Sequence, residues 1–247
     1  MVQCFAFFAA KLHEFTSPLD WPMTPEVLFY TRRSVRSFLP ALIPTCSTLE
    51  RILLAAARAP SGTNTQPWKV TVLRGESLTN LTAKLLAAAD DPDRTTKYGE
   101  EYPYYPKQWN SPYLERRRKI GYDMYELLGI GKRDVPKMRE QWNRNFEFFG
   151  APVGLMFTID RVMEQGSWLD YGMFLQTLML AARAEGLDTC PQAAFNEFHS
   201  IILPHIGANA DEMLVCGMSL GFADENAVVN QLKTERAPIN EFVRFLD

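Results

Sequence analysis

Three arginines and one serine lie within five residues of one another, between Arg32 and Arg36 (Arg-Arg-Ser-Val-Arg). Guanidinium groups bind phosphate through paired, charge-assisted hydrogen bonds, and a nearby hydroxyl adds a further polar contact. A single arginine near the other end of the chain, Arg236, can complete such an anion site. The alternative is that these cations stabilise the carboxyl end of a preceding helix, but one helix end does not need three arginines. We therefore interpret the stretch as the anchor of a phosphorylated cofactor.

A second polar stretch runs from Ser61 to Trp68 and reads Ser-Gly-Thr-Asn-Thr-Gln-Pro-Trp. It supplies small hydrogen-bond donors and acceptors. An ordinary polar turn between a helix and a strand is the simpler interpretation. A turn this short does not need so many amide and hydroxyl groups, so we group the stretch with the arginines.

The chain offers few side chains that can carry a reaction themselves. Gly217 to Gly221 matches the G-x-S-x-G nucleophile motif, which needs a strand–turn–helix context and a later histidine. All three histidines precede Ser219 and a polar tail follows it, so we interpret these residues as part of a packed strand. No H-E-x-x-H, G-x-G-x-x-G or P-loop pattern is present, and no metal site is expected. Cys190 and Cys216 are possible thiols without an evident base, so a bound cofactor is the expected carrier of the reaction.

The composition is that of an ordinary globular protein of 247 residues, with 47% hydrophobic and 22% charged residues. One large domain is expected, and the net charge of −3 argues against non-specific nucleic-acid binding. The four cysteines are widely spaced and form no C-x-x-C pair, which favours a reducing, cytoplasmic location. The apolar start, residues 4–10, is too short to span a bilayer and lacks a basic flank, so no membrane partner is expected.

Capping signals and periodicity predict the elements that position these groups. Thr24-Pro25-Glu26 predicts a helix start, and Ser47-x-x-Glu50 and Ser167-x-x-Asp170 match the capping box. Helices are predicted at 24–33, from 47 until Pro60 stops the helix, and at 77–89, 111–128, 134–148 and 167–183, and strands at 69–73, 152–159 and 213–222. Helices dominate, which predicts an α+β or three-layer domain with a central sheet over residues 24–247, after an N-terminal extension of residues 1–23.

The predicted helix from Ser167 to Arg183 is apolar on nearly every side. A helix with this pattern is expected to be buried all round. That burial places it in the domain core, in a subunit interface, or in both.

Residues 90–112 form a long predicted loop that is rich in aromatic residues and interrupted by prolines. A loop of this length is typical of a functional or mobile segment, and we interpret it as a lid over a flat ligand, with scattered surface aromatics as the alternative. A nearby cation is a candidate partner for a substrate carboxylate. The candidate cations are Lys107, Arg116, Arg117 and Arg118.

Two motifs in this order resemble the opening signature of the FMN-dependent nitroreductase superfamily. They are Arg32 to Phe38 (RRSVRSF) and Ala59 to Trp68 (APSGTNTQPW). The late stretch from Thr234 to Val243 is similar to the family's C-terminal segment, and the resemblance extends from about residue 25 onward. The tyrosine-rich segment and the stretch from Pro191 to Phe195 look most like the nitrobenzoate-reductase branch. The first two motifs also resemble iodotyrosine deiodinases, which share the fold.

The resemblance implies a three-layer fold with a central, mostly antiparallel sheet, and a homodimer with FMN at the subunit interface. Ser61 and its neighbours would reach the FMN of the partner subunit. The implied cofactor-binding residues are Arg32, Arg33, Ser34, Arg36, Ser61, Gly62, Asn64, Gln66, Pro191, Gln192, Ala193 and Arg236. The implied substrate-binding residues are Thr63, Tyr104, Tyr105 and Trp109.

The resemblance also implies a ping-pong reaction without a catalytic side chain. NADH or NADPH would deliver hydride to N5 of FMN and leave, and a nitroaromatic or quinone acceptor would then be reduced. The alternatives are a reductive dehalogenase of the deiodinase type, a flavin-binding protein without turnover, and a structural dimer that has lost FMN. The complete arginine set argues against the last of these.

Overall fold

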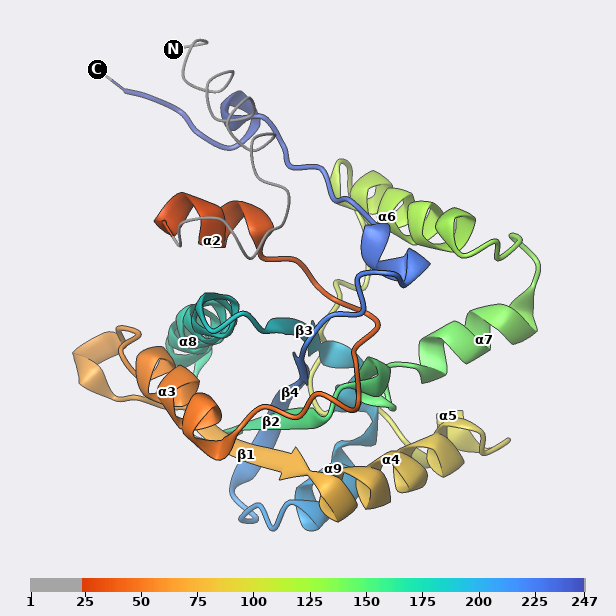
Figure 1. Cartoon of the computed structure of the whole chain (residues 1–247), viewed down its shortest axis with the longest axis horizontal. Coiled ribbons are helices and arrows are strands. Elements are labelled where there is room, and N and C mark those ends of the chain that lie inside the picture. Colours follow the sequence, from red (N-terminus) through yellow and green to blue (C-terminus); the bar gives the residue numbers. More distant parts are fainter. Residues whose placement is uncertain (1–23, 247) are drawn as a thin grey trace.

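The computed structural model describes residues 24–246, so the predicted N-terminal extension, residues 1–23, lies outside the described residues. The described chain is built on an antiparallel sheet with strand order β1-β2-β4-β3 (Figure 1). The strands are β1 (Lys69–Arg74), β2 (Val153–Asp160), β3 (Asp188–Gln192) and β4 (Glu212–Gly221). β2 and β4 are buried along almost their whole length, whereas β1 and β3 form the edges. Apolar runs such as Val-Gly-Leu-Met-Phe suit central strands with both faces covered.

Helices cover both faces of this sheet, as Figure 1 shows. The helices of the described chain are α2 (Pro25–Thr31), α3 (Cys46–Ala56), α4 (Gly75–Ala89), α5 (Arg94–Lys97), α6 (Tyr113–Leu127), α7 (Val135–Asn143), α8 (Gln165–Ala184) and α9 (His199–His205). α3 and α8 pack on one face around Phe157 and Phe174. α4 and α9 pack on the other around Met156 and Phe198. The predicted three-layer α+β fold with an antiparallel sheet is therefore confirmed.

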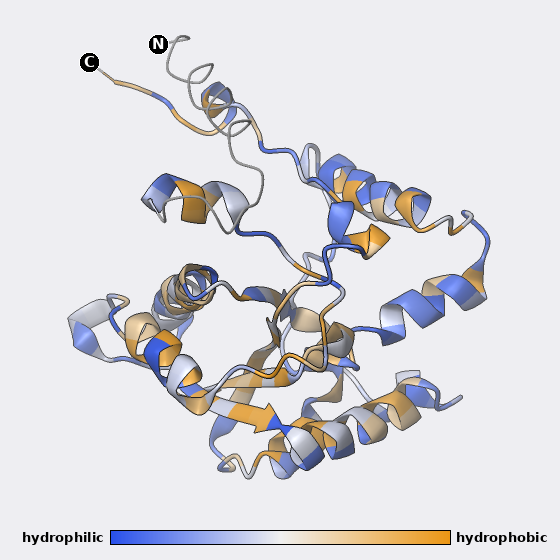
Figure 2. Cartoon of the chain, in the orientation of Figure 1, coloured by the Kyte–Doolittle hydropathy of each residue, from blue (hydrophilic) through white to orange (hydrophobic). Residues whose placement is uncertain are grey.

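Alternation along β2 explains why the sheet has two cores. Leu155 and Phe157 belong to the cluster under α3 and α8, whereas Met156 belongs to the opposite cluster. Each fully buried side chain of this kind stabilises the fold by about 1.5–3 kcal/mol. Figure 2 shows apolar residues on the strands and a mostly hydrophilic α7 at the periphery.

Several predicted helix ends are confirmed by their hydrogen bonds. Thr24 caps α2 by accepting from the Val27 N–H at 3.4 Å, and Asp134 caps α7 by accepting from the Lys137 N–H at 3.3 Å. Gly186 follows α8 with φ of +75°, a backbone conformation that glycine adopts without strain. α2 ends at Thr31, so the arginine run begins directly after the helix.

Both predicted capping boxes are wrong. The Thr45 hydroxyl caps α3 by accepting from the Thr48 N–H at 3.1 Å, because this earlier hydroxyl already reaches the first turn. α8 begins at Gln165, two residues before Ser167, and the Asp170 carboxylate turns to another segment. α7 ends at Asn143 instead of near Phe148, whose φ of +50° is incompatible with a continuing helix.

Within one chain, the helix predicted to be buried all round is buried along one stripe only, and its burial in a subunit interface stays a prediction. α8 buries Tyr171, Phe174, Leu178 and Ala182, but Leu169 on another face is 70% exposed. The helix therefore serves the core with one stripe and presents an apolar surface outward. Within residues 24–246, no helix is long and apolar enough to cross a membrane.

Candidate functional site

The arginine run lies along the free edge of β3. The Val35 N–H donates to the Thr189 carbonyl at 3.1 Å, and Ser34 forms a parallel bridge with Thr189. Val35 is fully buried and anchors the segment. An edge strand has unpaired backbone groups, so it can bind an extended segment in this way. The arginines on either side of Val35 are thereby fixed beside β3.

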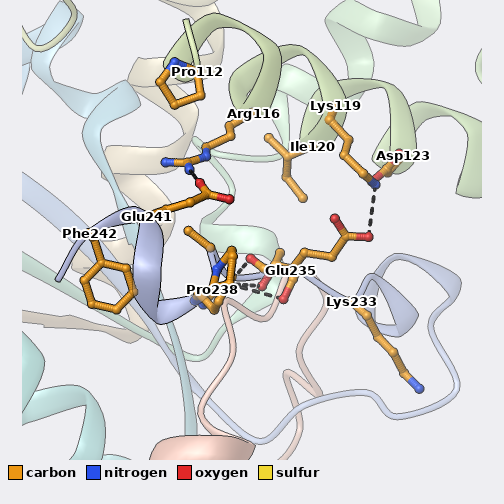
Figure 3. A pocket seen from close by; sticks show the side chains of 13 residues that line it. Pro112, Arg116, Lys119, Ile120, Asp123, Lys233, Glu235, Pro238, Glu241 and Phe242 are labelled. Carbon is orange, nitrogen blue, oxygen red and sulfur yellow. Dashed lines mark hydrogen bonds and ion pairs between the residues drawn. The ribbon is translucent and has the colours of Figure 1, made fainter. Parts of the chain in front are cut away.

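The C-terminal segment brings Arg236 to the same place. Arg32 and Arg236 both line a cleft of about 1010 Å³. A second cleft of about 850 Å³ lies between this segment and α6, and Arg236 lines it too (Figure 3). There Arg116 binds Glu241 at 2.6 Å, and Lys119 lies 3.7 Å from Glu235. The C-terminal segment is thus held against α6 by ion pairs, with Arg236 facing both clefts.

Three guanidiniums of this cluster have no carboxylate partner within the described part of the chain. Across residues 24–246, neither Arg32, Arg36 nor Arg236 forms an ion pair with a carboxylate; Arg36 contacts the Ser34 carbonyl, and Arg236 contacts Thr234 and the carbonyl of Glu235. Partial burial and then the neighbouring Arg236 lower the pKa of Arg32. Cations held together at such a cost are typical of a site for an anion.

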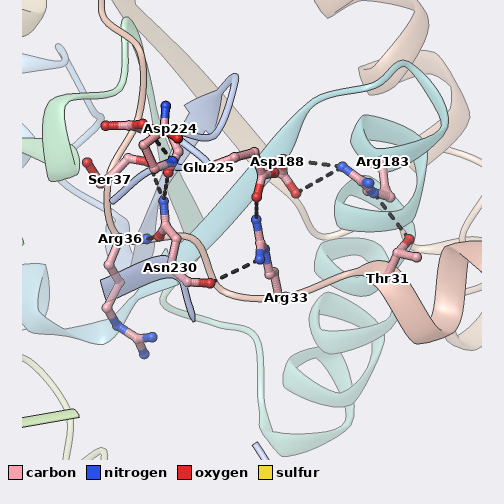
Figure 4. Close-up of polar contacts among 10 residues, drawn as sticks. Thr31, Arg33, Arg36, Ser37, Arg183, Asp188, Asp224, Glu225 and Asn230 are labelled. Atoms are coloured by element: carbon pink, nitrogen blue, oxygen red, sulfur yellow. Dashed lines mark hydrogen bonds and ion pairs between the residues drawn. The ribbon is translucent and has the colours of Figure 1, made fainter. Parts of the chain in front are cut away.

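Arg33 differs from Arg32, Arg36 and Arg236 because its guanidinium has a carboxylate partner, and Figure 4 shows its surroundings. Its guanidinium binds Glu225 at 2.5 Å and the Asn230 carbonyl at 3.0 Å. On the other side of the network, Arg183 of α8 binds Asp188 at 3.2 Å and Thr31 Oγ1 at 3.2 Å. Burial raises the pKa of Asp188 despite the nearby arginines. Arg33 therefore ties the arginine run to the C-terminal segment.

Asn230 is the residue that positions Arg36, and no local sequence pattern indicates this role. The Arg36 N–H donates to Asn230 Oδ1 at 2.8 Å, and Asn230 Nδ2 donates to the carbonyls of Ser37 at 2.8 Å and Asp224 at 2.9 Å. Its side chain is only 4% exposed. No motif around Asn230 predicts its contacts with Arg36 and Ser37, because these two residues lie almost 200 positions earlier in the chain.

At the end of β3, the side chain of Gln192 is hydrogen-bonded within the protein, so at this residue only the backbone can contact a ligand. Gln192 Nε2 donates to the Asn145 carbonyl at 2.7 Å, and Gln192 Oε1 accepts from Ser219 Oγ at 2.6 Å. Pro191 is exposed and Ala193 is half-buried, so only small groups lie beside the backbone there. The buried Ser219 is a strand residue with its hydroxyl engaged, as predicted.

The two buried thiols are poor nucleophiles. Burial raises the pKa of Cys190 to about 11 and that of Cys216 to about 12. A thiol of this kind stays protonated at neutral pH, and the thiolate is the reactive form. The thiols therefore supply no chemistry of their own at this site.

The polar stretch from Ser61 to Gln66 is held in an unusual backbone conformation. Thr63, Asn64 and Gln66 have φ of 48°, 62° and 49°, in the left-handed region. The Gln66 N–H donates to Ser61 Oγ at 3.0 Å, and the Gly62 N–H donates to Asp170 Oδ2 at 3.1 Å. The stretch is therefore a shaped loop with exposed side chains.

Within one chain, the loop from Ser61 to Gln66 lies far from the arginine run. Asp170 holds the loop near the start of α8, whereas Arg183 near the end of α8 contacts Thr31 beside the arginine run. Thirteen helical positions separate Asp170 from Arg183, which corresponds to roughly 20 Å along the helix axis. Figure 1 shows the same separation, with the loop beyond α3 and the arginines after α2.

The aromatic segment is anchored at its base and open at its tip. The Tyr102 hydroxyl donates to the Val215 carbonyl of β4 at 2.5 Å, and Asn196 Nδ2 donates to the Tyr102 carbonyl at 2.7 Å. Beyond this anchor, Tyr104 and Tyr105 are about half exposed, with ring centroids 4.8 Å apart. The predicted loop also contains the short helix α5, so only its later part projects.

The structure thus places this chain in a class of proteins with an antiparallel sheet between helical layers. An anion site that contains Arg32, Arg36 and Arg236 lies beside one edge of the sheet. Residues 30–222 match the sequence model of the Nitroreductase family, and the chain belongs to that family.

Named relatives cover nearly the whole chain. The chain is 44% identical over 216 residues to a 4-nitrobenzoate reductase of Pseudomonas putida, covering 87% of this chain and 92% of that protein. It matches the crystal structure of the FMN- and NADPH-dependent nitroreductase NfnB from Sphigopyxis sp. strain HMH with a TM-score of 0.87 and 33% identity, covering 91% of this chain and 100% of that one. NfnB of Mycobacterium smegmatis in complex with NADPH matches with a TM-score of 0.84 and 32% identity, covering 90% of this chain and 97% of that one.

Proposed function

We propose that this chain is an FMN-dependent nitroreductase that oxidises NADH or NADPH and reduces nitroaromatic acceptors, including nitrobenzoates, with quinones as further candidates. The observation that carries the proposal is the set of guanidiniums beside the edge of β3 that have no carboxylate partner among residues 24–246. Arg32, Arg36 and Arg236 have the donor chemistry that a phosphate monoester requires, so the residues present fit FMN. The family membership and the named activities of the relatives support the same function.

In this proposal the chain binds and orients the cofactor through distinct groups. Arg32, Arg36 and Arg236 hold the phosphate, Ser34 adds a polar contact, and Arg33 keeps this segment joined to Glu225. The exposed backbone from Pro191 to Ala193 lets a flat ring approach the end of β3. When bound, FMN would supply hydride transfer from the nicotinamide to the acceptor, the two substrates using the site in turn.

The other half of the site is proposed to come from a second copy of the chain. The loop residues Ser61, Gly62, Asn64 and Gln66 lie at the opposite end of α8 from the arginines, so they fit the site of a partner subunit better than their own. Leu54 of α3 and Leu169 of α8 are each 70% exposed and give this surface an apolar character. Both features support a symmetric homodimer with FMN at the interface.

The acceptor is proposed to bind against Thr63, Tyr104, Tyr105 and Trp109. The exposed side chain of Thr63 and the half-exposed rings of Tyr104 and Tyr105 are available for this contact. The cytoplasmic location stays a prediction from the cysteine pattern.

The first experiment is an absorbance spectrum of the purified protein without air. A flavin spectrum that bleaches with NADPH or NADH and returns on adding 4-nitrobenzoate is expected. A flavin spectrum that never bleaches would instead identify a flavin-binding protein without turnover.

A paired arginine variant tests the anchor directly. Arg32→Ala with Arg36→Ala should weaken FMN binding about 100-fold or more, because each charge-assisted contact is worth about 1.5–3 kcal/mol. The control is Arg133→Ala, an exposed arginine after α6. If both proteins bind FMN equally well, the assignment of the arginines is wrong.

A further inference from the structure

Four consecutive cations, Arg116 to Lys119, lie in the first half of α6, and within residues 24–246 only some of them form ion pairs. Arg116 binds Glu241, and Lys119 binds Asp123 at 2.7 Å. Within residues 24–246, Arg117 forms no ion pair with a carboxylate. The charge of Arg117 is therefore available to a ligand.

Arg117 is nevertheless held in place, by aromatic rings. Its guanidinium lies 4.9 Å from the ring centroid of Tyr105 and 5.0 Å from that of Trp109. The two rings are themselves in contact, with centroids 5.4 Å apart. Cation–π attraction to two neighbouring rings holds the guanidinium beside them, and its N–H groups remain hydrogen-bond donors. This geometry leaves the forked donors of Arg117 ready for a carboxylate.

The rings beside Arg117 are accessible to an aromatic ligand. Tyr104 is 52% exposed and Tyr105 is 51% exposed, and they meet edge to face. Aromatic contacts of this kind stabilise a bound arene. An arene carrying a carboxylate can therefore use the rings and Arg117 together.

The chain segment that carries Tyr104, Tyr105 and Trp109 is anchored to the sheet next to the proposed flavin site. Tyr102, at the base of the segment, is bonded to Val215 of β4. Gly217, two residues further along β4, is paired with Gln192 at the end of β3. The segment that carries the aromatic cluster thus leaves the sheet within two residues of the strand position opposite Gln192.

We infer that Arg117 determines specificity for nitroarenes that carry a carboxylate. It binds the carboxylate through its N–H fork while Tyr104 and Tyr105 contact the arene. This inference rests on the proposed nitroreductase function and deepens it by naming the residue that selects the carboxylated substrates. Of the four cations that the sequence offered, Arg117 is chosen because it is both unpaired and held by the aromatic cluster.

The test compares two substrates in the flavin-loaded enzyme. In Arg117→Ala, kcat/KM for 4-nitrobenzoate should fall about tenfold or more, mainly through KM, because a charge-assisted contact is lost. The value for nitrobenzene, which has no carboxylate, should change less than about twofold. Arg117→Gln keeps much of the stacking area without the charge, and it should give the same split.

The control removes a matched cation–aromatic contact elsewhere. Lys132→Ala loses a charge that lies 5.6 Å from the Tyr122 ring centroid, and it should leave both substrates unaffected. A second readout does not require turnover: benzoate should perturb the absorbance of the oxidised flavoprotein with a Kd that rises about tenfold in Arg117→Gln.

The outcomes separate the two proposals. Equal losses for both substrates, or unchanged values for 4-nitrobenzoate in a flavin-loaded Arg117→Gln, would overturn the role of Arg117 while leaving the nitroreductase function in place. A wild-type enzyme that reduces both substrates with equal kcat/KM would also overturn it. A wild-type protein that binds no flavin, or is never reduced by NADPH or NADH, contradicts the proposed function itself.

Discussion

Asp170 holds the strained loop that follows α3. Its carboxylate accepts from the Gly62 N–H at 3.1 Å, and the residue is only 7% exposed. The loop needs such a contact, because Thr63, Asn64 and Gln66 all lie in the left-handed region, where each side chain is disfavoured. Asp170 is therefore a positioning residue whose effect reaches the proposed site through the loop.

Removing this carboxylate should weaken FMN binding without unfolding the protein. Asp170→Ala should raise the Kd for FMN about tenfold, since a hydrogen bond to a charged acceptor is worth about 1.5–3 kcal/mol, and Asp170→Asn should have a smaller effect. Flavin fluorescence measures the Kd. Asp134→Ala is the control, because Asp134 also accepts from one backbone N–H but caps α7 far from the loop. Equal FMN affinity in Asp170→Ala and Asp134→Ala would contradict the role of Asp170.

The buried thiols give the folded protein a defined response to alkaline pH. Their folded pKa values of about 11 and about 12 exceed the ordinary value of 9.0. Above pH 9 the unfolded chain therefore binds fewer protons than the folded chain, and the free energy of unfolding falls as pH rises. Below pH 9 both states keep the thiols protonated, so the thiols make no contribution to the slope.

Substitution of both thiols should flatten this alkaline loss. Between pH 8 and pH 10 the wild type should lose about 1 kcal/mol per thiol more than Cys190→Ala with Cys216→Ala. Urea unfolding at each pH measures the slope, which is independent of the constant cost of the substitutions. The exposed Cys46 serves as the control through Cys46→Ala. Parallel slopes in all three proteins would show that the thiols are not buried as described.

At the scale of elements, Asn230 joins the arginine run to the C-terminal segment through hydrogen bonds. Its side chain makes three hydrogen bonds to backbone groups at Arg36, Ser37 and Asp224. Because a net hydrogen bond is worth about 0.5–1.5 kcal/mol, Asn230→Ala should lower the free energy of unfolding by about 2–4 kcal/mol. The same loss should weaken FMN binding, since Arg36 is no longer fixed.

Chemical denaturation and an FMN titration check this prediction together. The matched control is Asn226→Ala, an exposed asparagine four positions earlier in the same segment. Its loss should change stability by less than about 0.5 kcal/mol. If Asn230→Ala has the same free energy of unfolding as the wild type, the hydrogen bonds in Figure 4 do not join these segments.

Local sequence signals predicted the elements better than their ends. The alternation in Lys69–Arg74 and the apolar run in Val153–Asp160 are properties of the strands themselves, and both strands were predicted within one residue of their bounds. Ser47 and Ser167 matched the capping box equally well, yet Thr45 and the start of α8 at Gln165 prevailed. A cap depends on which hydroxyl reaches the first turn, and the pattern alone does not contain that geometry.

The sequence predicted only those parts of the candidate site whose residues lie together in one short motif. The arginine run and the Ser61–Gln66 loop are continuous in sequence, so both were found. Asn230 and Asp170 act through partners far away along the chain, and no local pattern connects them. The same reason hid the pairing of Arg116 with Glu241, which the sequence left as one of four equivalent cations.

At the scale of the whole molecule, the separation of the loop from the arginines is the central property of the chain. Leu54 of α3 and Leu169 of α8 are each 70% exposed, and Leu169 adjoins Asp170, which holds the loop. Burying such residues against a second copy stabilises an interface by roughly 25 cal/mol per Å² of apolar area. A symmetric pair can then place each loop beside the arginines of the other chain.

The first consequence is that the protein should be a dimer in solution. In solution the protein should have twice the 28.2 kDa of one chain, as measured by light scattering during size-exclusion chromatography. Leu54→Asp with Leu169→Asp should shift it to monomer and release FMN, because both charges would be buried without partners. Val135→Asp is the control, since Val135 is 67% exposed on α7. A double variant that stays dimeric would place the interface elsewhere.

The second consequence is complementation between two inactive chains. One chain carries Arg32→Ala and Arg36→Ala, and the other carries Asn64→Ala and Gln66→Ala. Each homodimer should bind FMN poorly, because each site lacks one half. In a mixed dimer, one site combines both sets of substitutions, whereas the other combines intact arginines with an intact loop. Co-expressed, affinity-selected heterodimers should therefore bind about one FMN per dimer, half the wild-type amount. If both halves of each site came from the same chain, both sites of the heterodimer would stay defective, and mixing would restore no FMN.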